Sequence, residues 1–472
     1  MSKLKSKFSK EIKKEKIEED NNNNQNQIEE NDKKNKSRKK AEDYVHLSYD
    51  NFLLHYTNGE KAIEKDIKNC KKMDIYSYNR DFIWFIFLGI LPYKTSSNWK
   101  SIITDNRSLY DSYKKELITN EIEEFIDKKK IENKFHEYYK FQEILSKDDY
   151  DILDLIKLDV KRTFQDIDLF HLDKIQKILI TILFIFSKKN KILSYRQGMS
   201  ELCAIFLYVL YKEQVIKSAF IKNDESFLFY LFHYNNEFLE QDTYTMFSKF
   251  MLSGFINFFN YNDKQYENSY LNKLSPEQIK SLSKKEIINS NDSELKKRIF
   301  LLFYDKFPLI DKNLYNFVSD KIYPDLVIFK WFICIFSREF EINHVLHLWD
   351  LILLYEFIDK YYSNIHKDKK SKKEKKIDKN DKKINVIKEN NIIDNNDSDK
   401  NINDEINLEK NYMFIDYIIL SMLYKVKSTI LKLKSSSKIM AFLMKYPENI
   451  DIKDICQKAL DFYHKINPNN KI

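Results

Sequence analysis

The sequence predicts an all-α protein, and two observations lead to this. Glycine occurs only 4 times and proline 6 times in 472 residues, so residues that interrupt helices or form tight hairpin turns are scarce. Apolar residues make up 43% of the chain, and in several segments they recur at the three- and four-residue spacing of a helix that packs on one face. A chain of this length can bury a large core, in one helical domain or in two smaller ones.

Composition divides the chain into folding and non-folding parts. The N-terminal region is mostly Lys, Glu and Asn, and it contains too few apolar residues to fold by itself. Two later polar stretches are expected to be insertions, because a long surface loop costs little closure entropy. The predicted division is a disordered arm over 1–43, a lead-in over 44–75, one domain over 76–465 with a polar loop at about 262–297 and a low-complexity insertion at about 361–410, and a tail over 466–472.

The first buried helix is predicted just after residue 80. Residues 82–88 are apolar on every side, and Gly89 and Pro92 follow as a helix stop. Helical spacing continues over 99–113, whereas residues from about 120 to 148 are more polar and are expected as surface helices or loop. Further helices are predicted from the same spacing at 175–186, 202–209, 227–251, 317–357 and 412–443.

The net charge of +8 lies almost entirely in the polar segments. Residues 1–40 hold 13 Lys and Arg against 8 Asp and Glu, and residues 361–410 hold 13 against 11. The rest of the chain is therefore close to neutral, and we expect no nucleic-acid partner. The lysine-rich segments could touch anionic lipid, although plain disorder accounts for them.

Cysteine usage and hydropathy indicate a cytoplasmic protein. The cysteines lie far apart and form no CxxC pair, as expected in a reducing compartment; they are Cys70, Cys203, Cys334 and Cys456. The longest apolar runs, 82–91 and 202–211, are half of the roughly 20 residues that span a bilayer. The first 40 residues have no apolar core of the kind found in secretory signals.

Two short polar islands, 156–163 and 195–199, stand out at the ends of apolar segments. A rigid scaffold can aim polar side chains placed in this way outward. Taken alone, each has a structural explanation: Arg162 could pair with Asp159 on a helix surface, and Gln197 could start a helix beside the turn residue Gly198.

Together with residues 80–89, the two islands resemble in order the motifs RxxxWxxLLG, IxxDxxRT and YxQGM of the TBC-domain GTPase-activating proteins for Rab GTPases. Residues 323–324, 331–332, 336–340 and 348–350 look like later helices of that domain. Within the family, 159–164, 242–247 and 443–447 look most like TBC domain family member five, a branch associated with the retromer coat and the late-endosomal Rab. The resemblance covers roughly 76–463.

The resemblance implies a multi-helix TBC domain that binds a Rab in its GTP state and accelerates hydrolysis in trans. Arg162 matches the family's arginine finger, which stabilises charge on the transferring phosphoryl group, and Gln197 matches its glutamine finger, which orients the attacking water. Supporting roles are expected for Asp159, Thr163, Tyr195 and Gly198. Asp159 would orient Arg162 or its neighbourhood, and Tyr195 and Gly198 would shape the turn that exposes Gln197. Arg80 and Trp84 are expected to be structural.

The resemblance also implies partners and a cellular setting. The protein would have no cofactor of its own and would act on GTP and Mg²⁺ bound to the Rab. A retromer-like coat and peripheral contact with endosomal membranes are candidate interactions. Phe87 replaces a motif leucine, and Gln165 stands where the family often has proline, which could loosen the segment that carries Arg162. The alternative is therefore a catalytically weak module or scaffold that binds an active Rab or a retromer-like trafficking complex.

Other chemistry has less support in the sequence. The four glycines are too widely spaced for a nucleotide-binding loop. Ser200 lacks the GxSxG context of a nucleophile and has no histidine nearby. We expect no metal site at Glu341, His344 and His347, because a solvated helix face is sufficient to explain them.

Overall fold

The computed structural model describes residues 80–92, 98–127, 145–191, 193–218, 237–260, 269–377 and 411–468. Within these ranges every regular element is a helix and there is no strand, so the all-α prediction is confirmed. The predicted arm and lead-in, 1–43 and 44–75, lie outside the described residues, as do the last four residues of the predicted tail.

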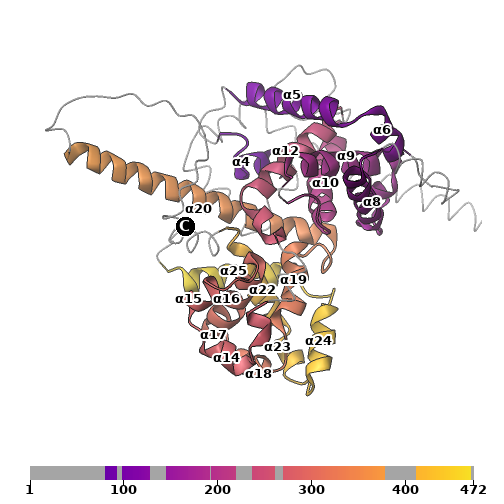
Figure 1. Ribbon diagram of the computed structural model, residues 1–472. Helices are drawn as coiled ribbons and strands as arrows, with labels where there is room; N and C mark the ends of the chain where they lie inside the picture. The colour runs from indigo at the N-terminus through magenta and orange to yellow at the C-terminus, as the bar shows by residue number, and fades with distance from the viewer. Residues whose placement is uncertain are drawn as a thin grey trace, which may run out of the picture.

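Helices from the first half of the chain gather in the upper part of Figure 1. Helix α12 packs against α5, α9 and α10, and α9 also packs against α8. Their bounds are α4 (Arg80–Phe87), α5 (Trp99–Leu117), α6 (Asn120–Asp127), α8 (Lys147–Arg162), the 3-10 helix η1 (Asp168–His171), α9 (Asp173–Lys189), α10 (Met199–Ser218), α12 (Leu239–Leu252) and η2 (Phe255–Phe259).

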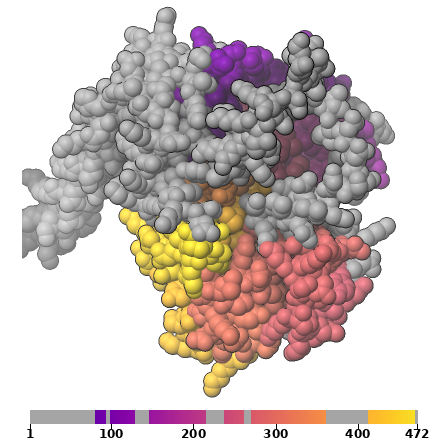
Figure 2. All heavy atoms as spheres, turned by 90° about the vertical axis from the view of Figure 1, so that its left-hand side faces the viewer, coloured from indigo at the N-terminus to yellow at the C-terminus, as the bar shows by residue number. Residues whose placement is uncertain are grey.

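Helices from the second half form the lower part of Figure 1, and α20 runs between the two groups. The C-terminal helices, yellow in Figure 2, lie against the salmon helices that precede α20. Their bounds are η3 (Leu271–Lys273), α14 (Pro276–Ser281), α15 (Lys284–Ile288), α16 (Glu294–Leu301), the π-helix η4 (Leu302–Lys306), α17 (Phe307–Ile310), α18 (Lys312–Val318), α19 (Pro324–Ile333), α20 (Ile342–Ile377), α22 (Phe414–Lys425), α23 (Lys427–Ile430), α24 (Ser436–Met444) and α25 (Ile452–Ile466).

An aromatic cluster joins the two groups. Trp84 of α4 stacks on Trp349 of α20 with ring centroids 5.8 Å apart, and Phe206 of α10 meets both rings edge-on. Phe250 of α12 also stacks on Trp349, with ring centroids 5.3 Å apart. All four side chains are fully buried, and each contributes roughly 1.5–3 kcal/mol by burial alone. Helices from both halves therefore share one core.

A buried ion pair fixes α4 on α20. Arg80 donates from Nε and Nη2 to the two carboxylate oxygens of Asp350 at 2.9 and 3.0 Å, and Trp84 Nε1 donates to Asp350 Oδ1 at 2.9 Å. All three side chains are buried. Arg80 and Trp84 thus satisfy a buried carboxylate that joins α4 to α20.

Two further buried carboxylates hold other helices together. In the upper group, Arg107 of α5 binds Asp242 of α12 through two hydrogen bonds of 2.8 and 2.6 Å. In the lower group, Asp416 of α22 accepts from Arg298 at 3.0 Å and from Lys306 at 2.6 Å. Charged hydrogen bonds of this kind fix which helix faces meet.

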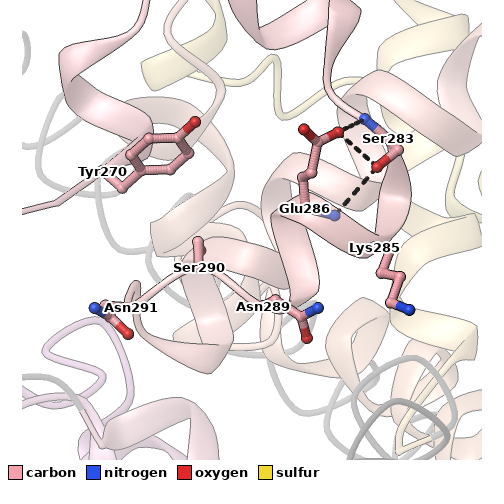
Figure 3. Close-up of a pocket in the computed structure, with 7 residues that line it drawn as sticks. All are labelled: Tyr270, Ser283, Lys285, Glu286, Asn289, Ser290 and Asn291. Carbon is pink, nitrogen blue, oxygen red and sulfur yellow. Dashed lines mark hydrogen bonds between the residues drawn. The ribbon is translucent and has the colours of Figure 1, made fainter.

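Two predicted loops are helical where the structure describes them. The stretch predicted as a polar loop at 262–297 forms η3, α14, α15 and the start of α16 from residue 269 on. Short polar sequences fold here because both short helices carry a capping box, Ser275 with Gln278 and Ser283 with Glu286. The second of these is visible in Figure 3.

The second predicted insertion is also helical at its start, because α20 continues to Ile377. Residues 342–377 contain no glycine or proline, and Lys and Glu are good helix formers, so nothing in the sequence stops the helix at 361. Residues 378–410 lie outside the described ranges.

Most other helix predictions are confirmed. Helix α4 ends at Phe87 and the chain reverses at Gly89, which has φ +68; glycine is the residue that takes this left-handed conformation without strain. Predicted helices at 99–113, 175–186 and 202–209 correspond to α5, α9 and α10, whereas 227–236 lies outside the described residues. No described helix is long and apolar enough to cross a bilayer.

Candidate functional site

Helix α8 ends with Arg162, and local interactions fix that end. Ser146 caps its start by accepting from the Asp149 amide at 3.2 Å. Beyond Arg162 the backbone leaves the helix: Thr163 is extended with ψ 122, and Phe164 has φ +43. Thr163 is buried and its hydroxyl bonds to the Asp159 carbonyl at 2.9 Å. Arg162 is therefore held at an abrupt helix terminus.

Gln165 is tied to this terminus. Its side chain donates from Nε2 to the Lys161 carbonyl at 3.2 Å, which satisfies one of the free carbonyls at the end of α8. The ring of Phe164 stacks on Phe170 of η1 with centroids 5.3 Å apart. These two contacts connect the segment after Arg162 to α8 and to η1.

The second polar island forms a loop before α10, and the carboxylate of Asp159 organises it. Tyr195 Oη donates to Asp159 Oδ2 at 2.8 Å, and the Gly198 amide donates to the same oxygen at 3.4 Å. Asp159 is 6% exposed and Tyr195 is 4% exposed. Burial and the neighbouring Asp159 carboxylate raise the pKa of Tyr195 well above 10, so its hydroxyl stays protonated and can donate.

The contacts of Asp159 point away from Arg162. It does not form the surface salt bridge with Arg162 that its spacing allows, because it lies on the buried side of α8. Its carboxylate holds Tyr195 and Gly198, which form the turn around Gln197. The aspartate is thus the link between the helix that ends at Arg162 and the loop that carries Gln197.

A second link runs parallel to the first. The hydroxyl of Thr163, next to Arg162, bonds with the hydroxyl of Ser200 in the first turn of α10 at 3.0 Å. Ser200 is thereby engaged in a structural contact. Arg162 and Gln197 each adjoin a residue of these links, Thr163 and Gly198, so the two side chains come from neighbouring segments.

Arg162 and Gln197 themselves are exposed. Among the described residues neither makes an ion pair or a side-chain hydrogen bond. An arginine and a glutamine that are presented from fixed backbone but left unpartnered can bind a polar group on another molecule without first breaking internal bonds. The two side chains suit charge stabilisation and amide hydrogen bonding, and neither is a nucleophile.

The glutamine loop rests on the C-terminal half of the protein, which sequence reasoning missed. Gly198 has φ +99, and a Cβ added there would lie 3.0 Å from Ile333 Cγ2 and 4.0 Å from Cys334 Sγ, at the end of α19. Close approach and positive φ together require glycine here. The nearby first turn of α10 contacts the same region through Glu201.

Glu201 binds two residues of the turn between α19 and α20. Ser337 Oγ donates to Glu201 Oε2 at 2.5 Å, and Arg338 Nε donates to Glu201 Oε1 at 2.6 Å. Residues 336–340, expected in a helix, lie in this turn instead, because Ile335 and Phe336 take positive φ values that no helix accommodates. No periodic pattern marks such a turn, so this contact could not be predicted from sequence.

The part of the chain that the structure describes contains no candidate metal site and no exposed cysteine thiol. There is no group of three or more metal-ligating side chains among those residues. His347 lies 3.8 Å from Asp350, whose oxygens already accept from Arg80 and Trp84. Burial raises the pKa of the thiols of Cys203, Cys334 and Cys456, which are free and buried.

A shallow pocket lies far from the two exposed side chains. Figure 3 shows its lining around α15, which sits in the lower part of Figure 1 while α8 sits in the upper part. The lining residues are Tyr270, Ser283, Lys285, Glu286, Asn289, Ser290 and Asn291. None of them is a candidate site residue, and Ser283 and Glu286 are already bonded to each other as a helix cap.

Comparison with known proteins agrees with this architecture. Residues 77–363 match the family model of the Rab-GTPase-TBC domain. The chain is 32% identical over 181 residues to TBC1 domain family member 5 homolog B of Dictyostelium discoideum, covering 37% of this chain and 17% of that protein. It is 26% identical over 287 residues to TBC1 domain family member 5 of Mus musculus, covering 58% and 33%.

A solved structure shares the fold. The crystal structure of the Ypt/Rab-GAP domain of Gyp1p superposes with a TM-score of 0.50 at 15% sequence identity, covering 82% of this chain and 87% of that one. The curated relatives are much longer than the matched region, since the chain spans only 17% to 33% of the two proteins named above.

Proposed function

Because the chain belongs to the Rab-GTPase-TBC domain family, we propose that it is a GTPase-activating protein that accelerates GTP hydrolysis by a Rab-family GTPase. One observation carries the proposal: a single buried carboxylate, Asp159, binds the turn around Gln197 from the helix that ends at Arg162. Two exposed side chains of the types that hydrolysis needs thereby come from two linked segments, and neither has a partner among the residues that the structure describes.

Arg162 acts on charge. Hydrolysis of GTP spreads negative charge over the oxygens of the transferring phosphoryl group, and a guanidinium supplied in trans stabilises that charge, with rate effects on the order of 10³ to 10⁵. Arginine suits this role because its charge is permanent and its planar group can bind two oxygens at once. The C-terminal position on α8 keeps the backbone rigid up to the finger.

Gln197 acts on water. Its carbonyl can accept from the attacking water while its amino group donates to a phosphate oxygen. The GTP and Mg²⁺ belong to the Rab, and this chain contributes no cofactor. Gln197 thus performs the orientation that the Rab's own glutamine performs without an activator.

The surface beside Arg162 supports docking of a protein partner. Leu155 and Leu158 lie seven and four positions before Arg162 on α8, a spacing that places all three on one helix face. These leucines are 42% and 45% exposed. An apolar pair of this kind on the helix that carries the finger gives a partner something to bury when it docks.

The test is single-turnover GTP hydrolysis by a panel of Rab proteins. Wild type should accelerate at least one Rab, and Arg162→Ala and Gln197→Ala should each lose most of that acceleration. Lys425→Ala and Gln457→Ala are matched controls, since both residues are remote surface positions bonded to Asp454 and Asp461. Equal rates for wild type and both finger variants would remove the proposal.

The same assay separates the second candidate, a module or scaffold that binds an active Rab or a retromer-like trafficking complex. Capture of a Rab that depends on GTP, with no increase in hydrolysis, would favour binding alone. The similarity to TBC1 domain family member 5 supports a role in vesicle and endosomal trafficking, with the protein in the cytoplasm and peripherally on endosomal membranes. Imaging of the tagged full chain with endosomal markers tests that placement.

A further inference from the structure

The turn between α19 and α20 has an unusual backbone. Ile335 and Phe336 have φ +43 and +65, and a β-branched residue such as Ile335 is a genuine outlier in this region. Both are fully buried. Such conformations persist only where surrounding contacts enforce them, and they are concentrated at functional sites.

Buried contacts enforce the turn. Trp349 Nε1, in the aromatic cluster, donates to the Ile335 carbonyl at 3.2 Å. The Phe336 amide donates to the Trp331 carbonyl at 3.2 Å, and the Ser337 amide donates to the Cys334 carbonyl at 3.1 Å. The consequence of the reversal is that Ser337 and Arg338 are directed at α10.

Both side chains end on one carboxylate. Glu201 receives Ser337 Oγ on one oxygen and Arg338 Nε on the other, at 2.5 and 2.6 Å. The Glu201 side chain is 10% exposed and that of Arg338 is 45% exposed. Because charged hydrogen bonds to a nearly buried carboxylate are roughly twice as strong as neutral ones, the first turn of α10 is held firmly against the C-terminal half.

Glu201 is four residues after Gln197, so the contacts of Glu201 with Ser337 and Arg338 also hold the loop that carries Gln197. On the other side of Gln197, Asp159 binds Tyr195 and Gly198. Beneath the loop, Gly198 lies against Ile333 and Cys334. The glutamine is thus fixed from the N-terminal half by α8 and from the C-terminal half by the α19–α20 turn.

We propose that Glu201, Ser337 and Arg338 form a clamp that positions Gln197 for hydrolysis, and that they are positioning residues that act through the loop. The clamp makes the second half of the domain part of the catalytic geometry. The proposal rests on the proposed function of Gln197. Displacing a reacting group by about 1 Å costs up to about 10²-fold in rate, so a loosened loop lowers the catalysed rate even when the fold is intact.

The experiment uses the full chain with Arg338→Ala, Arg338→Lys, Glu201→Gln and the double variant Glu201→Gln/Arg338→Ala. Single-turnover hydrolysis is measured against activator concentration, with Lys425→Ala as the control for loss of a surface ion pair. We expect Arg338→Ala to lower the saturating rate about tenfold, with a change of less than about twofold in the half-saturating concentration. Arg338→Lys should recover part of the rate, and the double variant should be no worse than the poorer single variant.

Hydrogen exchange provides a readout that does not depend on activity. Amides of residues 195–201 should exchange faster in Arg338→Ala than in wild type, while those of α22 should not change. Unchanged exchange at 195–201 overturns the clamp whatever the rates are. Faster exchange with an unchanged saturating rate overturns its role in positioning. If wild type accelerates no Rab, the proposed function fails and with it the catalytic meaning of the clamp, while the exchange result still decides whether the turn holds the loop.

Discussion

Replacing Tyr195 with phenylalanine removes one hydroxyl group and leaves the ring, so it isolates the hydrogen bond to Asp159. The bond is 2.8 Å long and its acceptor is a carboxylate that is 6% exposed. The remaining bond to that oxygen in the variant, from the Gly198 amide, is long at 3.4 Å. Asp159 would therefore lose its better partner, with little access to water in exchange.

The expected cost follows from the type of bond. A hydrogen bond to a charged group contributes about 1.5–3 kcal/mol, and the higher end applies when the charge is left buried. We expect Tyr195→Phe to lower the free energy of unfolding by that amount and to reduce the saturating rate of Rab-stimulated hydrolysis about tenfold by releasing the Gln197 loop. The half-saturating activator concentration should hardly change, because the docking surface on α8 is untouched.

Urea unfolding followed by circular dichroism measures the first effect, and single-turnover hydrolysis measures the second. Tyr270→Phe is the matched control, since Tyr270 is 44% exposed and its change should stay within about 0.5 kcal/mol. In the double variant with Asp159→Ala, the two costs should not add, because both changes remove the same bond. A Tyr195→Phe protein as stable and as active as wild type would refute the view that Asp159 organises the loop.

Three further predictions concern other parts of the molecule. Asp350→Ala should lower the free energy of unfolding by about 3–5 kcal/mol, because the buried Arg80 and Trp84 lose the carboxylate that accepts their hydrogen bonds. Urea unfolding checks this, and a loss below about 1 kcal/mol would contradict it. Leu155→Ser with Leu158→Ser should raise the half-saturating activator concentration while the free energy of unfolding changes by less than about 1 kcal/mol, since both side chains are well exposed; an unchanged concentration dependence would place the docking surface elsewhere. Burial raises the pKa of Glu339 above its ordinary value of 4.5, so the folded state holds that proton more tightly than the unfolded state does. The resulting stabilisation is present below about pH 4.5 and is lost as the pH rises through the raised pKa. Urea unfolding at several pH values should show wild type losing stability relative to Glu339→Gln over this interval, and parallel profiles would contradict the shift.

Local sequence rules predicted much of the fold because the buried helices are long and strongly apolar. The stop after α4 could be read from Gly89, and its φ of +68 is the conformation that glycine favours. The short helices α14 and α15 were not predicted, because each is too short for its apolar residues to show a helical repeat. Their stability comes from caps such as Ser283 with Glu286. Those pairs fit the S/T-x-x-E/Q signature, so attention to capping would have found them.

The site could be predicted only as far as linear motifs reach. Arg162 and Gln197 are recognisable from their spacing and neighbours, whereas the partners of Asp159 depend on a contact between residues 36 and 39 positions apart. The pairing of Glu201 with Arg338 spans 137 positions and depends on a strained turn at Ile335. No periodicity or motif encodes such a contact, because it arises from the packing of two halves of the chain.

The central claim is that Gln197 orients the attacking water while Arg162 stabilises charge. The most direct measurement is single-turnover hydrolysis by a Rab whose own water-positioning glutamine has been replaced with alanine. Wild-type activator should still accelerate this Rab, and Gln197→Ala should not. If the Rab variant is not accelerated at all while the unmodified Rab is, or if Gln197→Ala accelerates it as well as wild type does, the role assigned to Gln197 is wrong.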